Sequence, residues 1–192
     1  MIKKMGKNRK WIQIGILAVV LVIGVFTIYS NLSSGKEKKA LTAGDQAPNF
    51  KLAGIDGRTH ELADFKGKAL MINFWGTFCE PCKEEMPAIM HQYQQWSEKG
   101  VEVLAVNLGE SEVTIQNFID NSKANSEKTY RKPFTKDLPI LLDATDQVRK
   151  LYQVTQYPTT FFVDSKGNIR EIKIGGMDDA YINDRLTSLT TQ

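Results

Sequence analysis

The sequence contains few of the residues that bind metals or cross-link small domains, and this scarcity narrows its chemistry. Its 192 residues include only two cysteines and two histidines. A small secreted domain held together by disulfides needs more cysteines at wider spacing. Two cysteines also cannot complete a four-ligand structural zinc site, and His60 and His91 lie outside the cysteine pair. We therefore expect no metal site, and a cysteine pair that is reactive rather than structural.

The chain also lacks the basic surface that nucleic-acid binding requires. Its formal charge of +3 comes from one region, because residues 1–39 hold eight of the 25 basic residues and one of the 22 acidic residues. The rest of the chain is net acidic, so we expect no nucleic-acid partner.

The uncharged segment Trp11–Tyr29 predicts one transmembrane helix. Its 19 residues would span roughly 28 Å, and aromatic residues bracket it as they do at membrane interfaces. Five basic residues precede it and three follow, an excess that predicts a cytoplasmic N-terminus and an extracytoplasmic remainder. The alternative is a cleaved signal peptide, but its apolar run would be shorter and end in small residues. We expect an uncleaved signal anchor in the cell membrane.

This segment divides the chain into four parts. We expect a cytoplasmic basic segment, a transmembrane signal-anchor helix, a polar linker and an extracytoplasmic domain, over residues 1–10, 11–29, 30–40 and 41–192.

Strand and helix patterns alternate within the extracytoplasmic domain. Expected strands cover 50–52, 59–62, 69–75, 101–108, 138–142, 159–163 and 169–174. Expected helices cover 81–99, 112–121, 146–152 and 178–189, the third capped by Asp143 or Thr145. The polar stretch Asn121–Asp137 predicts an inserted surface loop. The fold class is α/β, a mixed sheet flanked by helices with an extra N-terminal β-hairpin.

Cys79 and Cys82 lie where an expected buried strand gives way to a helix. The start of a helix offers unpaired N–H groups and a positive dipole end, both of which favour a thiolate at Cys79. Cys82, one turn further, would be more covered and would resolve a mixed disulfide. Pro81 suits the first helical turn, where it needs no N–H partner. The alternatives are two inert buried thiols or half of a metal site.

Glu80 lies between the two cysteines, where its charge has two interpretations. Close to the sulfurs, it would raise the pKa of the thiols and make the reduced pair a stronger reductant. At a helix N-terminus, a carboxylate simply stabilises the helix. The sequence leaves both open.

Two stretches, Asn73–Pro87 and Tyr157–Ile169, resemble the thioredoxin superfamily, and the context of Asp45–Leu52 narrows the resemblance to its membrane-anchored ResA/TlpA-like branch. The resemblance implies a thioredoxin-like fold, with Cys79 as nucleophile and Cys82 as resolving cysteine. It also implies that Pro158 is a cis-proline that faces the sulfurs. With Pro158, three further residues would form the substrate-binding surface: Trp75, Pro81 and Tyr157. Trp75 could instead belong only to the core.

The resemblance further implies that Glu110, after the second buried strand, lies near the cysteines and accepts a proton during thiol exchange. The alternative is a solvated acid at a helix start. Two departures stand out. The Asn121–Asp137 stretch is longer and more basic than expected, and Gln153 stands where an acid is expected.

ResA-like proteins reduce the C-x-x-C-H disulfide of apocytochrome c before haem attachment, with electrons from a CcdA-type membrane carrier. The resemblance therefore implies a protein disulfide reductase that needs no bound cofactor. Three rivals stay open: a reductase for another exported protein, such as one of spore-wall synthesis, a thiol peroxidase, and a copper or haem chaperone. A peroxidase needs a Pro-x-x-x-Thr-x-x-Cys segment, and four residues before Thr77 the chain has Asn73.

Overall fold

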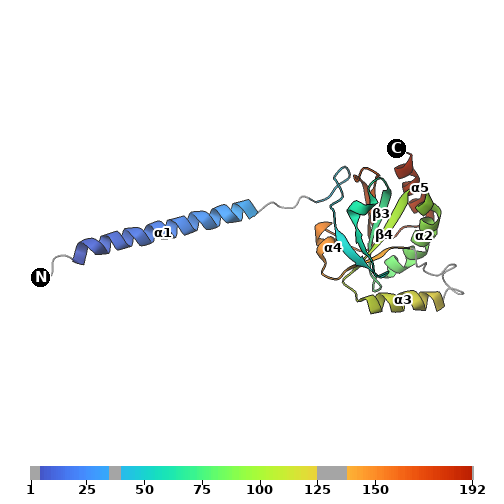
Figure 1. The fold of residues 1–192 in the computed structure, drawn as a ribbon, viewed down its shortest axis with the longest axis horizontal. Helices are drawn as coiled ribbons and strands as arrows, with labels where there is room; N and C mark the ends of the chain where they lie inside the picture. The colour runs from blue at the N-terminus through green and yellow to red at the C-terminus, as the bar shows by residue number, and fades with distance from the viewer. Residues whose placement is uncertain (1–4, 35–39, 125–137, 192) are drawn as a thin grey trace. The chain divides into compact units, whose positions relative to one another are not determined.

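The computed structural model describes residues 5–34, 40–124 and 138–191, which form two separate compact units divided after Lys39 (Figure 1). The first unit is the helix α1 (Met5–Ser34). Within the described residues, its Trp11–Tyr29 segment is the one stretch long and apolar enough to cross a membrane, with a mean hydropathy of 2.5. This helix is compatible with a single-pass anchor. It runs on to Ser34, so the predicted linker begins as helix.

The second unit is built on a seven-stranded mixed sheet in the order β2-β1-β5-β4-β3-β6-β7. Its strands are β1 (Lys51–Gly54), β2 (Thr59–Glu61), β3 (Ala69–Trp75), β4 (Val101–Leu108), β5 (Ile140–Asp143), β6 (Thr159–Val163) and β7 (Ile169–Ile174). β3, β4 and β5 are parallel, whereas the pairs β3–β6, β6–β7, β1–β5 and β1–β2 are antiparallel. The predicted mixed sheet with an extra hairpin is confirmed.

Helices cover both faces of this sheet, as the α/β pattern predicted. They are α2 (Glu80–Trp96), α3 (Glu112–Ala124), α4 (Gln147–Leu151) and α5 (Asp179–Thr190), with short 3-10 turns over Leu62–Phe65 and Ser97–Lys99. Residues of α2, α3 and α5 share one apolar cluster, and α4 packs into a second cluster on the opposite face. Figure 1 shows α4 on one side of β3 and β4 and α2 with α5 on the other.

The central strand β3 explains why two cores form. All seven of its residues are buried, and they alternate between the two faces. Met71 and Trp75 enter the cluster beneath α2, whereas Ile72 and Phe74 enter the other. Because β3 and β4 are parallel and β6 is antiparallel to β3, the ends of β3 and β4 meet the start of β6 at one edge of the sheet.

Two predicted helix ends differ from the structure, and one of two proposed helix caps is confirmed. α2 ends at Trp96 and tightens into a 3-10 turn before Gly100, whose φ of 82° ends it. α3 continues to Ala124, so the first residues of the predicted insert are helical and that part of the prediction is wrong; residues 125–137 lie outside the described chain. At the start of α4, the Asp143 carboxylate accepts N–H bonds from Val148 and Arg149, which confirms the first of the two proposed caps.

Candidate active site

Cys79 and Cys82 lie at the edge where β3 ends and α2 begins, and they form a disulfide. The chain leaves β3 at Trp75, turns through residues 76–78, and enters α2 with Cys79 as its N-cap. The N–H of Cys79 donates to the Gly76 carbonyl at 3.2 Å. Cys79 therefore lies beside the first, unpaired N–H groups of α2, which favour its thiolate in the reduced form.

The two sulfur-bearing residues differ in exposure, which divides their roles. Cys79 retains 9% of its surface and Cys82 retains none. Both belong to the apolar cluster beneath α2, together with Met86 and Met177. A substrate approaching from solvent thus meets Cys79 first, and Cys82 is covered, as the resemblance implied.

Glu110 binds the turn that carries Cys79. Its carboxylate accepts the backbone N–H of Thr77 at 2.7 Å and the Asn107 side-chain amide at 2.8 Å, and the Thr77 hydroxyl also donates to it. Glu110 is half-buried, and both of its oxygens are engaged. The predicted position beside the cysteine segment is therefore found. Its contacts fit a residue that positions the turn, and its role as proton acceptor stays a prediction.

Glu80 and Pro81 occupy the first turn of α2. The Glu80 side chain is largely exposed, and its carboxylate pairs with Lys83 one turn along the helix. This pairing weakens the negative potential that Glu80 exerts on the sulfurs. Pro81 is exposed at the predicted helical position, and Gly176 packs close to its carbonyl oxygen.

The Tyr157–Pro158 peptide bond is cis, as the resemblance predicted. Pro158 directly precedes β6, whose antiparallel register with β3 places it at the edge where the cysteine segment begins. The Tyr157 ring lies 6.1 Å from the ring of Phe78 in an edge-to-face arrangement. Substrate binding by Tyr157 and Pro158 stays a prediction.

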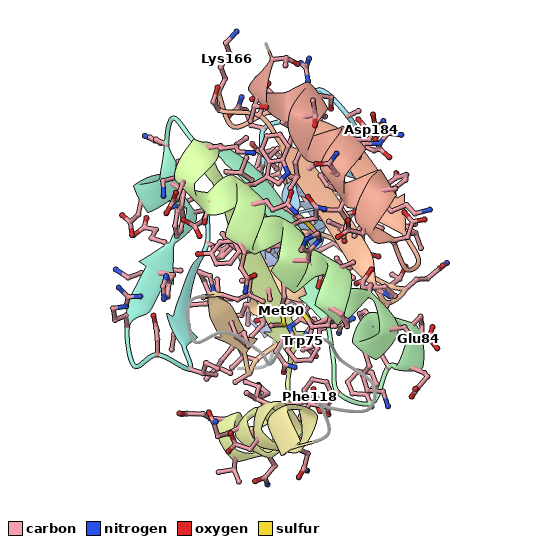
Figure 2. The ribbon with its side chains drawn as sticks, turned by 90° about the vertical axis from the view of Figure 1, so that its right-hand side faces the viewer. Trp75, Glu84, Met90, Phe118, Lys166 and Asp184 are labelled. Carbon is pink, nitrogen blue, oxygen red and sulfur yellow. A yellow bond between two sulfur atoms is a disulfide. The ribbon has the colours of Figure 1, made fainter. Side chains whose placement is uncertain are left out.

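The aromatic side chain that faces solvent beside the cysteines is Phe78 rather than Trp75. Phe78 is 63% exposed, whereas Trp75 is fully buried. Figure 2 places Trp75 between α2 and α3, next to Phe118, and their ring centroids are 5.7 Å apart. This is the core position that the sequence left open for Trp75. An isolated aromatic residue carries no sequence signal that separates a core from a surface position, which is why Phe78 was missed.

Sequence reasoning also missed Glu85, a buried carboxyl one turn beyond Cys82 on α2. Glu85 is 2% exposed and accepts hydrogen bonds from the Asn73 side chain at 2.9 Å and the Met177 N–H at 3.1 Å. Burial raises the pKa of Glu85 to about 7, although both hydrogen bonds act in the opposite direction. Residues three apart on a helix are neighbours, so Glu85 lies on the same side of α2 as Cys82, one turn further along. The three-residue spacing was the available signal.

Two further expectations concerned Gln153 and metal binding. Gln153 follows α4 with a φ of 56° and lines a small cavity with Leu41 and Ile174. Within the described ranges, no three His, Cys, Asp or Glu side chains are grouped to hold a metal ion.

A C-x-x-C disulfide at the start of α2, on this mixed sheet, is the arrangement of a thioredoxin-like thiol–disulfide oxidoreductase. The AhpC/TSA family pattern matches residues 43–172, and the chain belongs to this family and to the ResA-type thiol–disulfide oxidoreductases within it.

Named relatives and solved structures agree with this assignment. The chain is 38% identical over 178 residues to the thiol–disulfide oxidoreductase ResA of Bacillus subtilis, covering 93% of this chain and 92% of that protein. It is 35% identical over 186 residues to ResA of Geobacillus thermodenitrificans, covering 96% and 99%. A putative thiol:disulfide interchange protein DsbE from Chlorobium tepidum superposes with a TM-score of 0.68 at 25% identity, covering 79% and 99%. StoA from Bacillus subtilis superposes with a TM-score of 0.60 at 27% identity, covering 72% of this chain and 96% of that chain.

Proposed function

We propose that this chain reduces disulfides of exported proteins, and that its substrate is the C-x-x-C-H disulfide of apocytochrome c before haem attachment. The observation that carries the proposal is the near full-length similarity to ResA proteins, which extends over the cysteine motif. The slightly exposed Cys79 beside a fully buried Cys82 suits a protein disulfide as substrate.

The reaction follows from the two positions. The Cys79 thiolate attacks one sulfur of the substrate disulfide, forms a mixed disulfide and releases one substrate thiolate. Cys82 loses its proton to the Glu85 carboxylate and attacks the sulfur of Cys79, which releases the second substrate thiolate. The cysteine pair loses two electrons to the substrate sulfurs. Of the two protons that the substrate thiolates take up, one comes from Cys82, released again by Glu85, and the other comes from solvent.

The anchor gives this cycle a location. We propose that α1 spans the cell membrane once with its N-terminus in the cytoplasm, because the basic residues are concentrated before the apolar segment. The domain would then meet a CcdA-type membrane electron donor, which reduces the Cys79–Cys82 disulfide again. Tethering to the same membrane raises the effective concentration of both proteins.

The reduction potential of the Cys79/Cys82 pair tests the direction of the reaction. In the full chain in detergent at pH 7, we expect a value near or below roughly −230 mV after equilibration with glutathione or dithiothreitol. A value near about −120 mV would make the chain a disulfide-forming oxidant and overturn the proposal.

Deletion of the encoding gene tests the substrate. We expect loss of c-type cytochromes, restored by a chemical reductant outside the membrane and by the wild-type chain but not by Cys79→Ser. Normal cytochromes together with a defect in another exported disulfide protein would contradict the apocytochrome c assignment and leave the reductase activity intact.

A further inference from the structure

Asn73 is the one polar residue in the apolar strand β3, and it is fully buried beneath α2. Its side-chain nitrogen donates one hydrogen bond to Glu85 and one to the Thr160 hydroxyl, both at 2.9 Å. Thr160 is its partner across the β3–β6 register. Residues from two strands and one helix therefore meet at a single buried amide, next to the carboxyl that follows Cys82.

The Asn73 side-chain amide is oriented with its nitrogen toward Glu85 and Thr160, and this orientation leaves its oxygen buried without a hydrogen bond among the residues that the structure describes. An apolar residue of the same size would avoid the cost of this unpaired oxygen. The opposite orientation would set the Asn73 oxygen against an ionised Glu85 carboxylate and leave two N–H donors unpaired. The structure thus keeps an unsatisfied acceptor in order to direct both donors of Asn73.

The charged groups around Glu85 do not replace these donors. On α2, Lys83 pairs with Glu80, and Glu84 is exposed and directed away from Trp75 in Figure 2. Charged and titratable groups on the elements packed against α2 have other partners: Asp179 of α5 binds His91, Asp178 caps α5, and Glu102 of β4 binds Lys68 and Tyr93. Cys79 and Cys82 are joined to each other. Glu85 therefore depends on Asn73 and the Met177 N–H.

We propose that Asn73 is the positioning residue that keeps Glu85 able to release its proton, and that Thr160 fixes the Asn73 amide with its nitrogen toward Glu85. This inference rests on the proposed function of Glu85 in thiol exchange. Donation to a carboxylate stabilises its charged form, whereas burial alone favours the protonated form. The pKa of about 7 agrees with this balance, because burial raises it and the Asn73 bond lowers it. Without Asn73, Glu85 would hold its proton through the neutral range and could not accept one from Cys82.

The test is a titration of Glu85 in the oxidised full chain in detergent, followed by NMR with ¹³C-labelled glutamate. The Glu85 resonance is assigned by its absence in Glu85→Gln. We expect Asn73→Leu, which preserves size, to move the titration to higher pH by about one unit or more. Thr160→Val should move it in the same direction by less. The matched control Gln92→Met removes a buried amide of α2 that binds Trp96 and should leave it unchanged.

The pH profile of thiol exchange gives the second readout. The rate of the reduced chain with oxidised glutathione should show the same alkaline displacement in Asn73→Leu, and a merely structural role would not move it. An unchanged Glu85 titration in Asn73→Leu would overturn the inference. If that variant does not fold, an unchanged titration in Thr160→Val would do the same. The Glu85 titration and the pH profile do not depend on the reduction potential of the cysteine pair. A failure of the proposed reductase function would appear in that potential and is therefore distinguished from a failure of this inference.

Discussion

Two buried glutamates, Glu85 on α2 and Glu102 on β4, differ in the groups that bind their carboxylates. Glu85 is 2% exposed and Glu102 is 8% exposed. Glu102 accepts from the Lys68 ammonium at 3.0 Å and the Tyr93 hydroxyl at 2.9 Å. Glu85 accepts only neutral donors, the Asn73 amide and the Met177 N–H. One carboxyl has a cationic partner and the other, among the described residues, has none.

The positions of the two groups explain the difference. Glu102 lies opposite Leu70 near the start of β3, at the end of the strand away from the cysteines. There its ion pair with Lys68 holds the chain just before β3, and its hydrogen bond from Tyr93 joins α2 to β4. Glu85 lies one turn beyond Cys82, where a permanent ion pair would prevent it from exchanging a proton. A buried acid without a cation is costly, and it is found where thiol chemistry can use it.

The largest effect should come from removing the thiol chemistry at the cysteine end of the domain. We expect Cys79→Ser to lower the rate of disulfide exchange by more than about a thousandfold, because no thiolate is left to begin the attack. Stopped-flow reduction of oxidised glutathione by the reduced chain measures this. Cys82→Ser should instead accumulate the mixed disulfide at Cys79, seen by mass spectrometry. A mixed disulfide that formed only at Cys82 would reverse the assigned roles.

The next effect is the pH dependence of stability that Glu85 creates. Its pKa rises from 4.5 to about 7 on folding, so the folded chain binds the proton more tightly than the unfolded chain. The wild type should therefore lose roughly 3 kcal/mol of unfolding free energy, relative to Glu85→Gln, as the pH rises from 4.5 to 7. Urea unfolding of both oxidised chains in detergent measures the difference. A constant difference across this window would show that Glu85 is not a raised, buried acid.

At the end of the sheet away from the cysteines, Glu102→Gln should lower the free energy of unfolding without changing the rate of thiol–disulfide exchange. Lys68 is partly exposed, so water replaces some of the lost interaction, and we expect a loss of about 1–2 kcal/mol. The same urea unfolding should show it, while the rate with oxidised glutathione and its pH profile stay at wild-type values. A displaced pH profile in this variant would mean that the two ends are coupled, and the contrast between the two glutamates would fail.

The sequence predicted the strands and helices better than it predicted the difference between Glu85 and Glu102. The bounds of β3, β4, β6 and β7 match the predicted ranges. The first three are largely apolar runs, and β7 follows a clear hairpin turn. The cysteine pair, the cis bond before Pro158 and the position of Glu110 were also accessible from motifs. Glu85 was not, because it follows Lys83 and Glu84 in a run that has the pattern of a solvated helix start. Its burial depends on tertiary packing, with Asn73 of β3 on one side and the segment at Met177 on the other.

The smallest effect concerns the surface of the cysteine end. Phe78 precedes Cys79, is 63% exposed and lies edge-to-face against the Tyr157 ring, so we expect a protein substrate that reaches the sulfur to contact it. We expect Phe78→Ser to raise KM for a peptide disulfide by about threefold to tenfold, since an aromatic contact is worth roughly 1 kcal/mol. The rate with oxidised glutathione, which is too small to cover Phe78, should stay constant. Equal losses with both substrates would instead mean that Phe78 shapes the turn at Cys79 and contributes nothing to substrate recognition.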